Sequence, residues 1–473
     1  MKSGHLLGTF LQIVNYLVFL HFVVLNCFYL FTTLIAFGSL RRFARRSRAV
    51  DLEEVLAGDV LPITLIAPAF NEEATCVEAV RALLTLRYPQ YEILMVNDGS
   101  KDNTLSRLRE TFEMEAVSRM PISPLPSAPI RGVYRSRVHP NLWVVDKQNG
   151  GKADSLNAGL SYCRTPLFCA LDADTLLERD ALMRIVRPFL EDASTVAAGG
   201  TVRIVNGCTV REGMVTEVRL PRNWLARFQV LEYLRAFLAG RVGWSALDAM
   251  LIISGAFGVF RRDMVTEIGG YATDTVGEDM ELVVRLHRHC REQKLHYRIV
   301  FVPEPMAWTE CPESTKILSN QRSRWERGLI ETLTRHRRMF LNPRYGRIGM
   351  VAYPYFVLLE MPGPLIQLLG LFTLALALYL DQVSTFFLVA FLLAAFIFGM
   401  ALSIGAVALE ELTFRRYLHF GDLLLLLWMG LIDNFGYRQL ANAWRVRGIF
   451  AKLRGAKGWG KMERRGFGAG RPT

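Results

Sequence analysis

The sequence predicts an α/β domain, built on a parallel sheet with helices on both faces and inserted between transmembrane helices. Strand-like and helix-like patterns alternate from residue 60 to residue 204, which is typical of a parallel sheet. Long apolar runs flank this region, at residues 9–38 and again from residue 348. The mean hydropathy is +0.21 although 21% of the residues are charged, as expected for a chain that combines both kinds of region.

The first apolar run, residues 9–38, is long enough to span a membrane and too long for the core of a signal peptide. Residues 1–48 are therefore predicted to form a transmembrane helix with a basic flank. Positive charge favours the cytoplasmic side, so the N-terminus is expected outside and residue 41 onward inside. The flank contains Arg41, Arg42, Arg45, Arg46 and Arg48.

Residues 49–347 are predicted to form a cytoplasmic domain. Helical patterns separate most of its strands, and one begins after Asn71. The four prolines in residues 120–132 predict a loop. The predicted strands are residues 63–70, 92–98, 142–147, 167–174 and 196–204.

Polar side chains follow the predicted strands, at Asn71–Glu72, at Asp98–Gly99–Ser100 and at the pair Asp172 and Asp174. Ligands of such folds bind beyond the carboxyl ends of the strands. At a period of two residues the paired aspartates would share one face and repel each other, so a divalent cation that bridges to a diphosphate would suit them. The alternative is a pair of loop aspartates that form Asx-turns.

Two further segments suit a nucleotide. The carboxylate of Asp98 can accept a hydrogen bond from a base or a ribose, or it can simply cap a βα turn. Gly150–Gly151 allows close approach of the backbone to a ligand, and Lys152 would supply a point charge for a phosphate. The alternative for Lys152 is a solvated lysine at a helix entry, since the GxxxxGK[ST] phosphate loop is missing.

Asp279 lies at the start of an apolar-periodic helix over residues 276–290. It is either an ordinary first-turn acid or a general base within reach of an acceptor hydroxyl.

The stretch NQRSRWERGL, residues 320–329, suits either a lipid headgroup or a substrate diphosphate. On a helix Gln321, Arg324, Trp325 and Gly328 share one face, and Arg322 lies one turn below Trp325, at its edge. Arginine makes bidentate contacts with phosphate, and an indole offers a flat wall to a sugar ring. This combination favours a diphosphate beside a sugar.

Residues 348–440 are predicted to form transmembrane and interfacial helices. An interfacial stretch and a spanning helix fill residues 349–380, and residues 384–409 form a second span. Asp433, Asn434 and Arg438 interrupt residues 420–440, so two crossings with a re-entrant or interfacial segment are favoured over three. This keeps the basic tail, residues 441–473, in the cytoplasm.

The composition excludes some classes of protein. The seven cysteines form no CxxC pair and their number is odd, so neither a disulfide framework nor a zinc site is predicted, and a reducing compartment fits best. The net charge of +12 is concentrated beside the apolar runs, which favours anionic lipid. No nucleic-acid-binding signature occurs, so no nucleic acid is expected as a partner.

Seven motifs together carry a family resemblance. The chain resembles the membrane-bound family 2 glycosyltransferases, and among them the processive synthases of poly-N-acetylglucosamine, chitin oligomers, hyaluronan and cellulose. The resemblance covers roughly residues 60–330 and implies a Rossmann-like nucleotide-sugar-binding domain with a mixed, mainly parallel sheet. The motifs are PAFNEE (68–73), NDGS (97–100), GGKADSLNAG (150–159), DAD (172–174), SGAFG (254–258), GED (277–279) and QRSRW (321–325).

The resemblance implies a role for each matched position. Asp98 would contact the uracil of a UDP-sugar, and Lys152 would support the nucleotide. Asp172 and Asp174 would hold the ribose and a Mg²⁺ or Mn²⁺ ion on the diphosphate. Asp279 would be the catalytic base.

In the last motif, Gln321, Arg324 and Trp325 would bind the diphosphate and the end of the acceptor. Asn71, Glu72 and Arg322 are also expected to contact substrate. GED and NDGS replace the family's more usual TED and DDGS, but neither change removes a charge that the mechanism needs.

These roles imply an inverting glycosyltransferase of the cell membrane that extends a β-linked polysaccharide from a UDP-sugar. The alternatives are transfer of one sugar to a lipid-linked acceptor or glycolipid, and a catalytically silent membrane scaffold. The scaffold is disfavoured because every acid and base of the motif set is present. The expected partners are the UDP-sugar, a carbohydrate or lipid-linked acceptor, membrane lipids, and an export or accessory subunit that could complete a channel.

Overall fold

The structure is a computed structural model that describes residues 2–47, 60–414, 416–417 and 419–455. The chain divides into two compact units. An α/β unit comprises Arg41–Pro221 and Leu247–Cys311, and a helical unit comprises Met1–Leu40, Arg222–Ala246 and Pro312–Lys461. All seven cysteines lie in the described residues and are free thiols.

The α/β unit is built on one ten-stranded sheet with a small hairpin beside it. Its strands are β1 (Ile63–Ala69), β2 (Tyr91–Asp98), β3 (Met114–Ala116), β4 (Ile130–Ser136), β5 (Leu142–Lys147), β6 (Leu167–Leu171), β7 (Leu176–Leu177), β8 (Thr195–Ile204), β11 (Phe257–Arg261) and β12 (Arg298–Thr309), and the hairpin pairs β9 (Thr209–Arg211) with β10 (Met214–Glu217).

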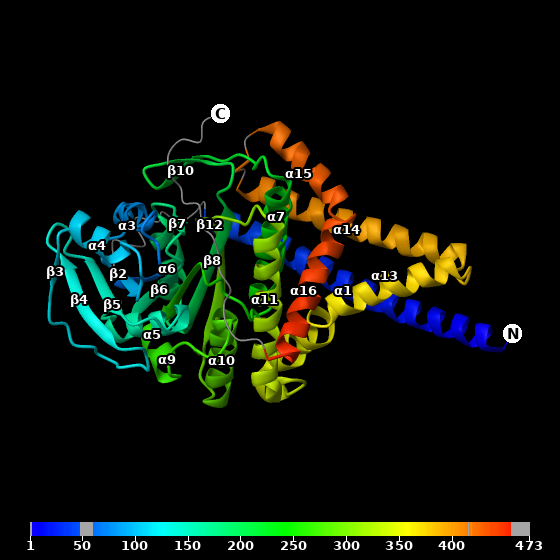
Figure 1. The fold of residues 1–473 in the computed structure, drawn as a ribbon, viewed down its shortest axis with the longest axis horizontal. Helices are drawn as coiled ribbons and strands as arrows, with labels where there is room; N and C mark the ends of the chain where they lie inside the picture. Colours follow the sequence, from blue (N-terminus) through cyan, green and yellow to red (C-terminus); the bar gives the residue numbers. More distant parts are fainter. Residues whose placement is uncertain (1, 48–59, 415, 418, 456–473) are drawn as a thin grey trace. The chain divides into compact units, whose positions relative to one another are not determined.

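The strand order is β3-β4-β5-β2-β1-β6-β11-β8-β12-β7 (Figure 1). Parallel pairs join β5, β2, β1 and β6 in succession, and β8 pairs parallel with β12. The strands β4, β7 and β11 pair antiparallel with their neighbours. The prediction of a mixed, mainly parallel sheet is therefore confirmed.

The predicted strands agree with β1, β2, β5 and β8 to within a residue at each end. The remaining predicted strand, residues 167–174, corresponds to β6 and ends at Leu171. Asp172 and Asp174 lie in the turn that follows. Strand alternation therefore does not align these two aspartates, contrary to the prediction, because the backbone has already left the strand. Strand β4 also begins inside the predicted loop of residues 120–132, at Ile130.

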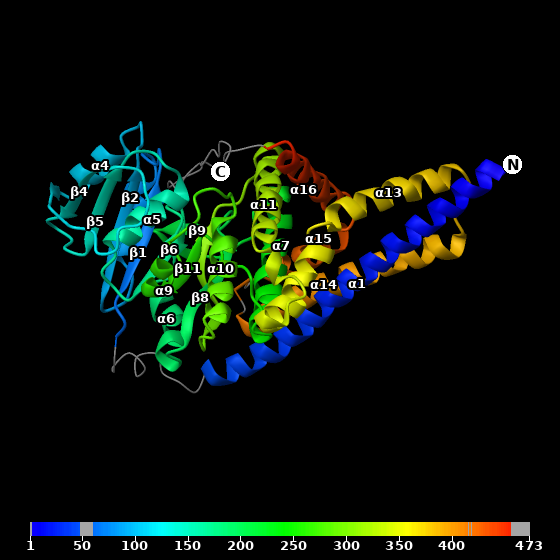
Figure 2. The same ribbon diagram turned by 90° about the horizontal axis from the view of Figure 1, so that it is seen from below.

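Helices cover both faces of this sheet. Helix α3 (Cys76–Leu84) connects β1 to β2, and α5 (Lys152–Tyr162) connects β5 to β6 in the opposite direction along the sheet. Right-handed crossovers therefore place α3 and α5 on opposite faces. Figure 2 shows α5 beside β1 and β2. The other helices of this unit are α4 (Thr104–Thr111), α6 (Ala181–Glu191), α9 (Arg262–Glu267) and α10 (Glu278–Glu292).

The helical unit contains three helices that are long and apolar enough to cross a membrane, within the described residues: Leu6–Arg45, Ile348–Tyr379 and Thr385–Thr413. They correspond to α1 (Lys2–Ser47), to a helical run that ends in α13 (Gly363–Tyr379), and to α14 (Thr385–Thr413). Tyr16 of α1 contacts Phe387 of α14, and Thr373 of α13 donates to Asn15 of α1 at 2.7 Å. Helix α15 (Phe420–Ile432) is apolar but has only 13 residues.

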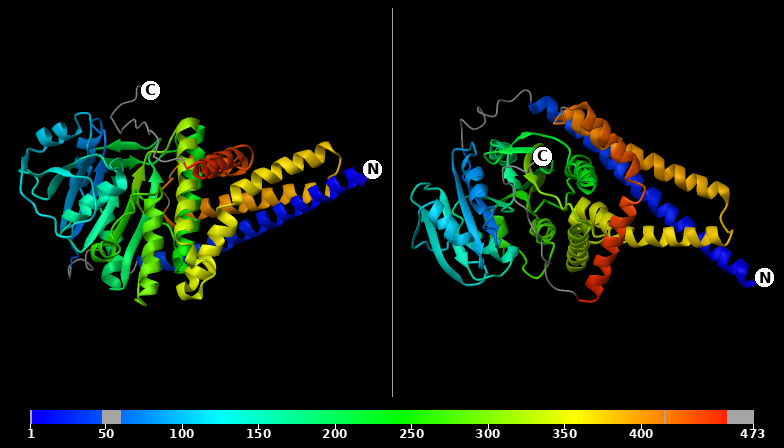
Figure 3. Two further views of the ribbon diagram at one scale, coloured as in Figure 1. Left: turned by 60° about the horizontal axis from the view of Figure 1, so that its bottom comes forward. Right: turned by 45° about the horizontal axis from the view of Figure 1, so that its top comes forward.

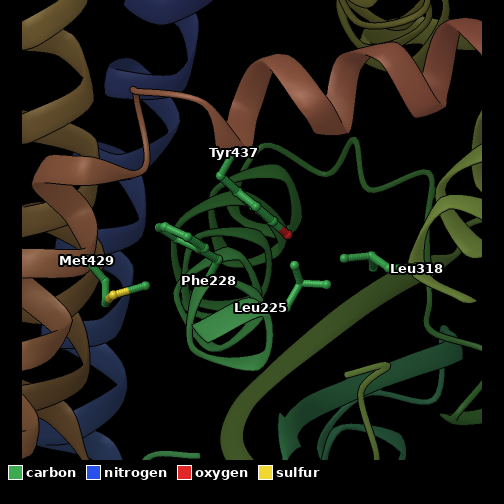
Figure 4. Packing of buried hydrophobic residues seen from close by; sticks show 5 residues of the cluster. All are labelled: Leu225, Phe228, Leu318, Met429 and Tyr437. Carbon is green, nitrogen blue, oxygen red and sulfur yellow. The ribbon is translucent and has the colours of Figure 1, made fainter. Parts of the chain in front are cut away.

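Three other helices of this unit pack around a shared apolar cluster. They are α7 (Trp224–Leu234), α11 (Thr315–Arg335) and α16 (Tyr437–Leu453); α16 is drawn red and α11 yellow-green in Figure 3. Helix α16 includes the first part of the predicted basic tail, and residues 456–473 of that tail lie outside the described residues, as does Arg48. The cluster consists of Leu225, Phe228, Leu318, Met429 and Tyr437 (Figure 4).

Short segments complete the helical unit. They are η1 (Arg235–Arg241), α8 (Val242–Ala246), η2 (Arg337–Met339), η3 (Pro343–Tyr345), η4 (Ile348–Ala352), α12 (Tyr353–Tyr355) and η5 (Phe356–Glu360).

Candidate active site

The carboxyl ends of four neighbouring parallel strands carry most of the predicted site residues. Asn71 and Glu72 follow β1, Asp98 ends β2, Lys152 begins the helix after β5, and Asp172 follows β6. The connections from β1 and from β5 run in opposite directions along the sheet. In open α/β sheets, a crevice that binds ligands typically forms where connections from neighbouring strands leave in opposite directions.

The turns after β1 and β2 are joined to each other. The backbone N–H of Asn71 donates to Oγ of Ser100 at 3.0 Å, and Oδ1 of Asn71 accepts from the N–H of Lys101 at 2.8 Å. The N–H of Glu72 donates to Oγ1 of Thr104 at 2.9 Å. Asn71 adopts a left-handed φ of 55°, a conformation that asparagine tolerates better than most residues, and Glu72 is buried. Both residues therefore organise the strand-end loops.

Asp98 receives four hydrogen bonds at its two carboxylate oxygens. Oδ1 accepts from Nζ of Lys147 at 2.5 Å and from the N–H of Gly150 at 2.9 Å. Oδ2 accepts from the N–H of Gly151 at 2.8 Å and from Nδ2 of Asn149 at 3.1 Å. The carboxylate thus anchors the double-glycine turn, in which Gly151 has a φ of 92° that favours glycine.

Lys147 is a site residue that the sequence analysis missed. Its side chain is fully buried at the end of β5, and its Nζ pairs with Asp98 at 2.5 Å and with Asp154 at 2.7 Å. A buried lysine is retained when it is paired and hydrogen-bonded. The available signal was a lysine at the end of a buried strand, followed by an aspartate in the next helix.

Lys152, at the start of α5, is the cation of a cluster of acids. Its Nζ lies 2.5 Å from Oδ1 of Asp172 and 3.8 Å from Oε1 of Glu278, and it donates to the carbonyl of Gly255 at 3.2 Å. Burial disfavours the charged form of Lys152, but Asp172 and Glu278 outweigh it and raise the pKa of this lysine. Lys152 therefore carries a positive charge where β5 and β6 end.

Asp279 joins the same cluster through the backbone. It lies in the first turn of α10, and its Oδ2 accepts from the N–H of Gly255 at 3.1 Å. One residue, Gly255, thus contacts the predicted base through its N–H and Lys152 through its carbonyl. A Cβ atom at position 255 would lie 3.0 Å from Nζ of Lys152 and 3.4 Å from Oδ2 of Asp279, which accounts for a glycine in the SGAFG segment.

The acids beside Lys152 suit a divalent cation that is shared with a substrate. Asp172 and Asp174 are half-buried carboxylates of one turn. No three His, Cys, Asp or Glu side chains in the described part of the chain gather into a complete metal cage. Mg²⁺ commonly binds one or two carboxylates and takes its other ligands from water and substrate phosphates. The donor set therefore fits Mg²⁺ or Mn²⁺ on a diphosphate.

The QRSRW segment belongs to the helical unit, on α11. Trp325 is 42% exposed and Gln321 and Arg324 are half-buried, whereas Arg322 is only 8% exposed. Nη2 of Arg322 donates to Oε2 of Glu232 on α7. The structure therefore gathers Asp98, Lys152, Asp172 and Asp279 in the α/β unit and the side chains of QRSRW in the helical unit.

Comparison with known proteins assigns the chain to a family. Residues 167–405 match the model of glycosyl transferase family group 2, and residues 64–121 match that of glycosyl transferase family 2. Poly-beta-1,6-N-acetyl-D-glucosamine synthase of Staphylococcus aureus (strain COL) is 28% identical over 274 residues, which are 58% of this chain. The same synthase of Staphylococcus epidermidis is 27% identical. The matched region spans 56% of each relative, little more than half its length.

A solved structure supports the fold. The mannosyltransferase PcManGT from Pyrobaculum calidifontis, in complex with GDP-Man and Mn²⁺, matches with a TM-score of 0.53 and 20% identity, covering 92% of this chain and all of its own. This structure agrees with the fold of the chain. The chain belongs to glycosyl transferase family group 2, and it is a glycosyltransferase.

Proposed function

We propose that this glycosyltransferase moves a sugar from a UDP-sugar to a growing β-linked polysaccharide at the membrane, with inversion at the sugar C1. The observation that carries the proposal is the cluster of Lys152, Asp172, Glu278 and Asp279 at one edge of the sheet, which supports the assignment of a metal site and a base there. The related poly-N-acetylglucosamine synthases make UDP-N-acetylglucosamine the first donor to test.

In the proposed reaction Asp279 accepts the proton of an acceptor hydroxyl as its oxygen attacks C1. The bond between C1 and the diphosphate breaks, and UDP leaves with the electron pair. A carboxylate suffices as the base because the hydroxyl loses its proton only as the new bond forms. The N–H of Gly255 holds Oδ2 of Asp279 at 3.1 Å, and Oδ1 accepts from the N–H of Met280 in the first turn of α10 at 2.8 Å.

Charge on the leaving diphosphate needs compensation. Lys152 supplies one positive charge, held in place by Asp172, Glu278 and the carbonyl of Gly255. Asp172 and Asp174 would hold Mg²⁺ or Mn²⁺, which when bound stabilises negative charge on diphosphate oxygens. We assign the uracil contact to Asp98 and the supporting loop contacts to Asn71 and Glu72.

On α11 we assign the acceptor end to Trp325, and the diphosphate to Gln321 and Arg324. The exposed indole suits a sugar face, because aromatic rings offer flat apolar surface. Truncating it should weaken the acceptor more than the donor. Trp325→Ala is thus expected to lower polymer yield strongly while UDP affinity changes little.

For the membrane we propose three crossings, α1, the run ending in α13, and α14, with α15 in the interface. Thirteen helical residues reach about 20 Å, which is short of a hydrocarbon core of about 30 Å. The N-terminus would then lie outside, and the α/β unit and the tail inside. Labelling of a cysteine placed at position 465 from outside intact cells would contradict this topology.

The test is a transfer assay with the purified chain in lipid, a panel of UDP-sugars, and Mg²⁺ or Mn²⁺. UDP release and a product of many sugars are expected with one donor, and none in excess chelator. Full turnover in chelator would remove the metal from the proposal. Absence of UDP release with every donor would refute the donor class.

The small number of apolar helices favours a second candidate, transfer of a single sugar to a lipid-linked acceptor. Three candidate spans in the described residues leave few helices to line a channel unless an accessory subunit adds some. A product that stops at one added sugar on a lipid would select this candidate.

A further inference from the structure

We propose that Arg322, the first arginine of QRSRW, is a positioning residue that fixes the ring plane of Trp325, and that Glu232 and Tyr437 hold this arginine in place. This assigns Arg322 a role behind the acceptor site, in place of the direct substrate contact that the motif suggests. The inference rests on the proposed function, in which Trp325 carries the acceptor sugar.

Glu232 of α7 immobilises the guanidinium of Arg322, and Tyr437 of α16 holds Glu232. Its Oε2 accepts from Nη2 of Arg322 and also from the hydroxyl of Tyr437 on α16, at 3.0 Å. Burial disfavours the charge of Arg322, but Glu232 outweighs it and raises the pKa of the arginine. A charged, paired and nearly inaccessible arginine has little freedom to move.

The same guanidinium lies against the indole. Cζ of Arg322 is 4.5 Å from the centroid of the Trp325 ring, three residues further along α11. This separation is within the range of a cation–π contact, which also favours a defined ring orientation. Since Trp325 keeps 42% of its surface exposed, the arginine supports the ring while leaving surface for a ligand.

Tyr437 is itself held by apolar packing, so the clamp does not depend on a mobile side chain. Its ring stacks on Phe228 with 4.4 Å between centroids and 14° between planes. Figure 4 shows the two rings side by side among Leu225, Leu318 and Met429. The helices α7, α11 and α16 are thus joined directly behind Trp325.

The environment of Arg322 argues against a second role on the diphosphate. If its guanidinium turned to a phosphate, it would leave the carboxylate of Glu232 without its cation. Breaking a buried ion pair in this way is strongly unfavourable. Arg324, two residues away and half-buried, is the arginine of the motif that we assign to phosphate.

The first test follows Trp325 itself. The full chain in lipid nanodiscs is labelled with 5-fluorotryptophan, and Trp325→Phe assigns one ¹⁹F resonance among the eight tryptophans. Glu232→Gln and Arg322→Lys are expected to shift or broaden this resonance, and Tyr437→Phe to do so less. Glu331→Gln is the matched control, because Glu331 forms another α11–α16 ion pair, with Lys452 at 3.0 Å. An unmoved Trp325 resonance in Glu232→Gln, or an equal shift in Glu331→Gln, would overturn the proposal.

The second test separates positioning from direct binding. UDP affinity should change less than about twofold in Arg322→Lys, while sugar transfer falls by about two- to fivefold, the range of a cation–π contact. Arg324→Lys should weaken UDP binding. An equal loss of UDP affinity in both variants would make Arg322 a phosphate ligand and refute the inference. If wild type binds no UDP, the proposed function fails, and the Trp325 resonance still decides whether Arg322 positions the ring.

Discussion

The charged groups of the two units are arranged in opposite ways. In the α/β unit Lys152 lies among several acids, namely Asp172, Glu278 and, through Gly255, Asp279. In the helical unit buried carboxylates pair with arginines of other segments. Asp433, with no exposed side chain, pairs with both Arg235 and Arg438 at 2.8 Å.

The difference separates groups that bind from groups that hold helices together. A group of carboxylates at a half-open strand edge suits a divalent cation that is shared with a diphosphate. The buried ion pairs of the helical unit already have their partners and need no ligand. They instead become costly when one partner is lost. Substitutions among the acids around Lys152 should therefore change catalysis. Substitutions in the buried ion pairs of the helical unit should change stability.

Asp279→Asn is the sharpest test on the catalytic side. Loss of a general base typically lowers the rate by about 10²–10⁴-fold. UDP affinity and the unfolding temperature should remain close to wild type, because the amide can still accept from the N–H of Gly255. Near-normal turnover in the transfer assay would exclude Asp279 as the base.

Asp433→Asn is the corresponding test in the helical unit. Both arginines would lose their carboxylate, and breaking a buried pair costs about 3–5 kcal/mol. Thermal unfolding in detergent, followed by circular dichroism, should show this loss while UDP affinity is retained. Glu115→Gln is the matched control, since its pair with Arg137 is exposed and worth about 1 kcal/mol or less. Equal effects of the two variants would contradict the comparison.

His287 of α10 should make the stability of the α/β unit depend on pH. Its Nε2 contacts the carbonyl of Met250 at 2.9 Å and its Nδ1 the hydroxyl of Tyr297 at 2.8 Å, and burial lowers its pKa to about 4. A lowered histidine pKa means that its contribution is complete above about pH 6.5 and is lost as the pH falls toward 4. The contribution is about 3 kcal/mol.

Denaturant unfolding between pH 7 and pH 4 measures this effect. The slope should be steeper for wild type than for His287→Gln, in which no imidazole titrates. Parallel curves for the two proteins would show that His287 carries a proton equally in the folded and unfolded chain.

Gly255→Ala should have the smallest effect. Its Cβ would lie 3.0 Å from Nζ of Lys152, so the lysine must shift by a few tenths of an ångström. A displacement of about 1 Å costs about a hundredfold, and we expect a loss of about tenfold in transfer. Stability should stay near wild type. Full activity would show that Lys152 adapts without cost to the reaction.

The sequence predicted the parts of the molecule that follow local rules. Parallel strands end at one edge, so Asn71, Asp98 and Asp172 could be placed together from strand patterns alone. The three long apolar helices and the short α15 followed from hydropathy and length. The turn geometry of Asp172 and Asp174 was missed, because period-two alternation holds only within a strand.

Partners distant in the chain could not be predicted. Glu232 lies 90 residues from Arg322 and 205 from Tyr437, and no local pattern relates them. Lys147 was overlooked because a lysine at a strand end is usually solvated, and the two acids that bury it come from β2 and α5. Similarly, Gly255 contacts Lys152 on α5 and Asp279 on α10, and both lie far from it in the sequence or on another element.

The helical unit is assembled from segments that are far apart in the sequence, which has a consequence for the synthesis of the protein. Arg445, on the last described helix, pairs with Glu326 at 2.7 Å and with Glu360 at 3.1 Å. Chains emerge from the ribosome N-terminal part first, so both glutamates wait about 5–25 s for their cation at usual elongation rates. Until then the helix that carries Trp325 lacks its ion pair with Arg445 of α16. Ribosome-bound chains that end before Arg445 would therefore lack the ion pairs that join α16 to Glu326 and Glu360.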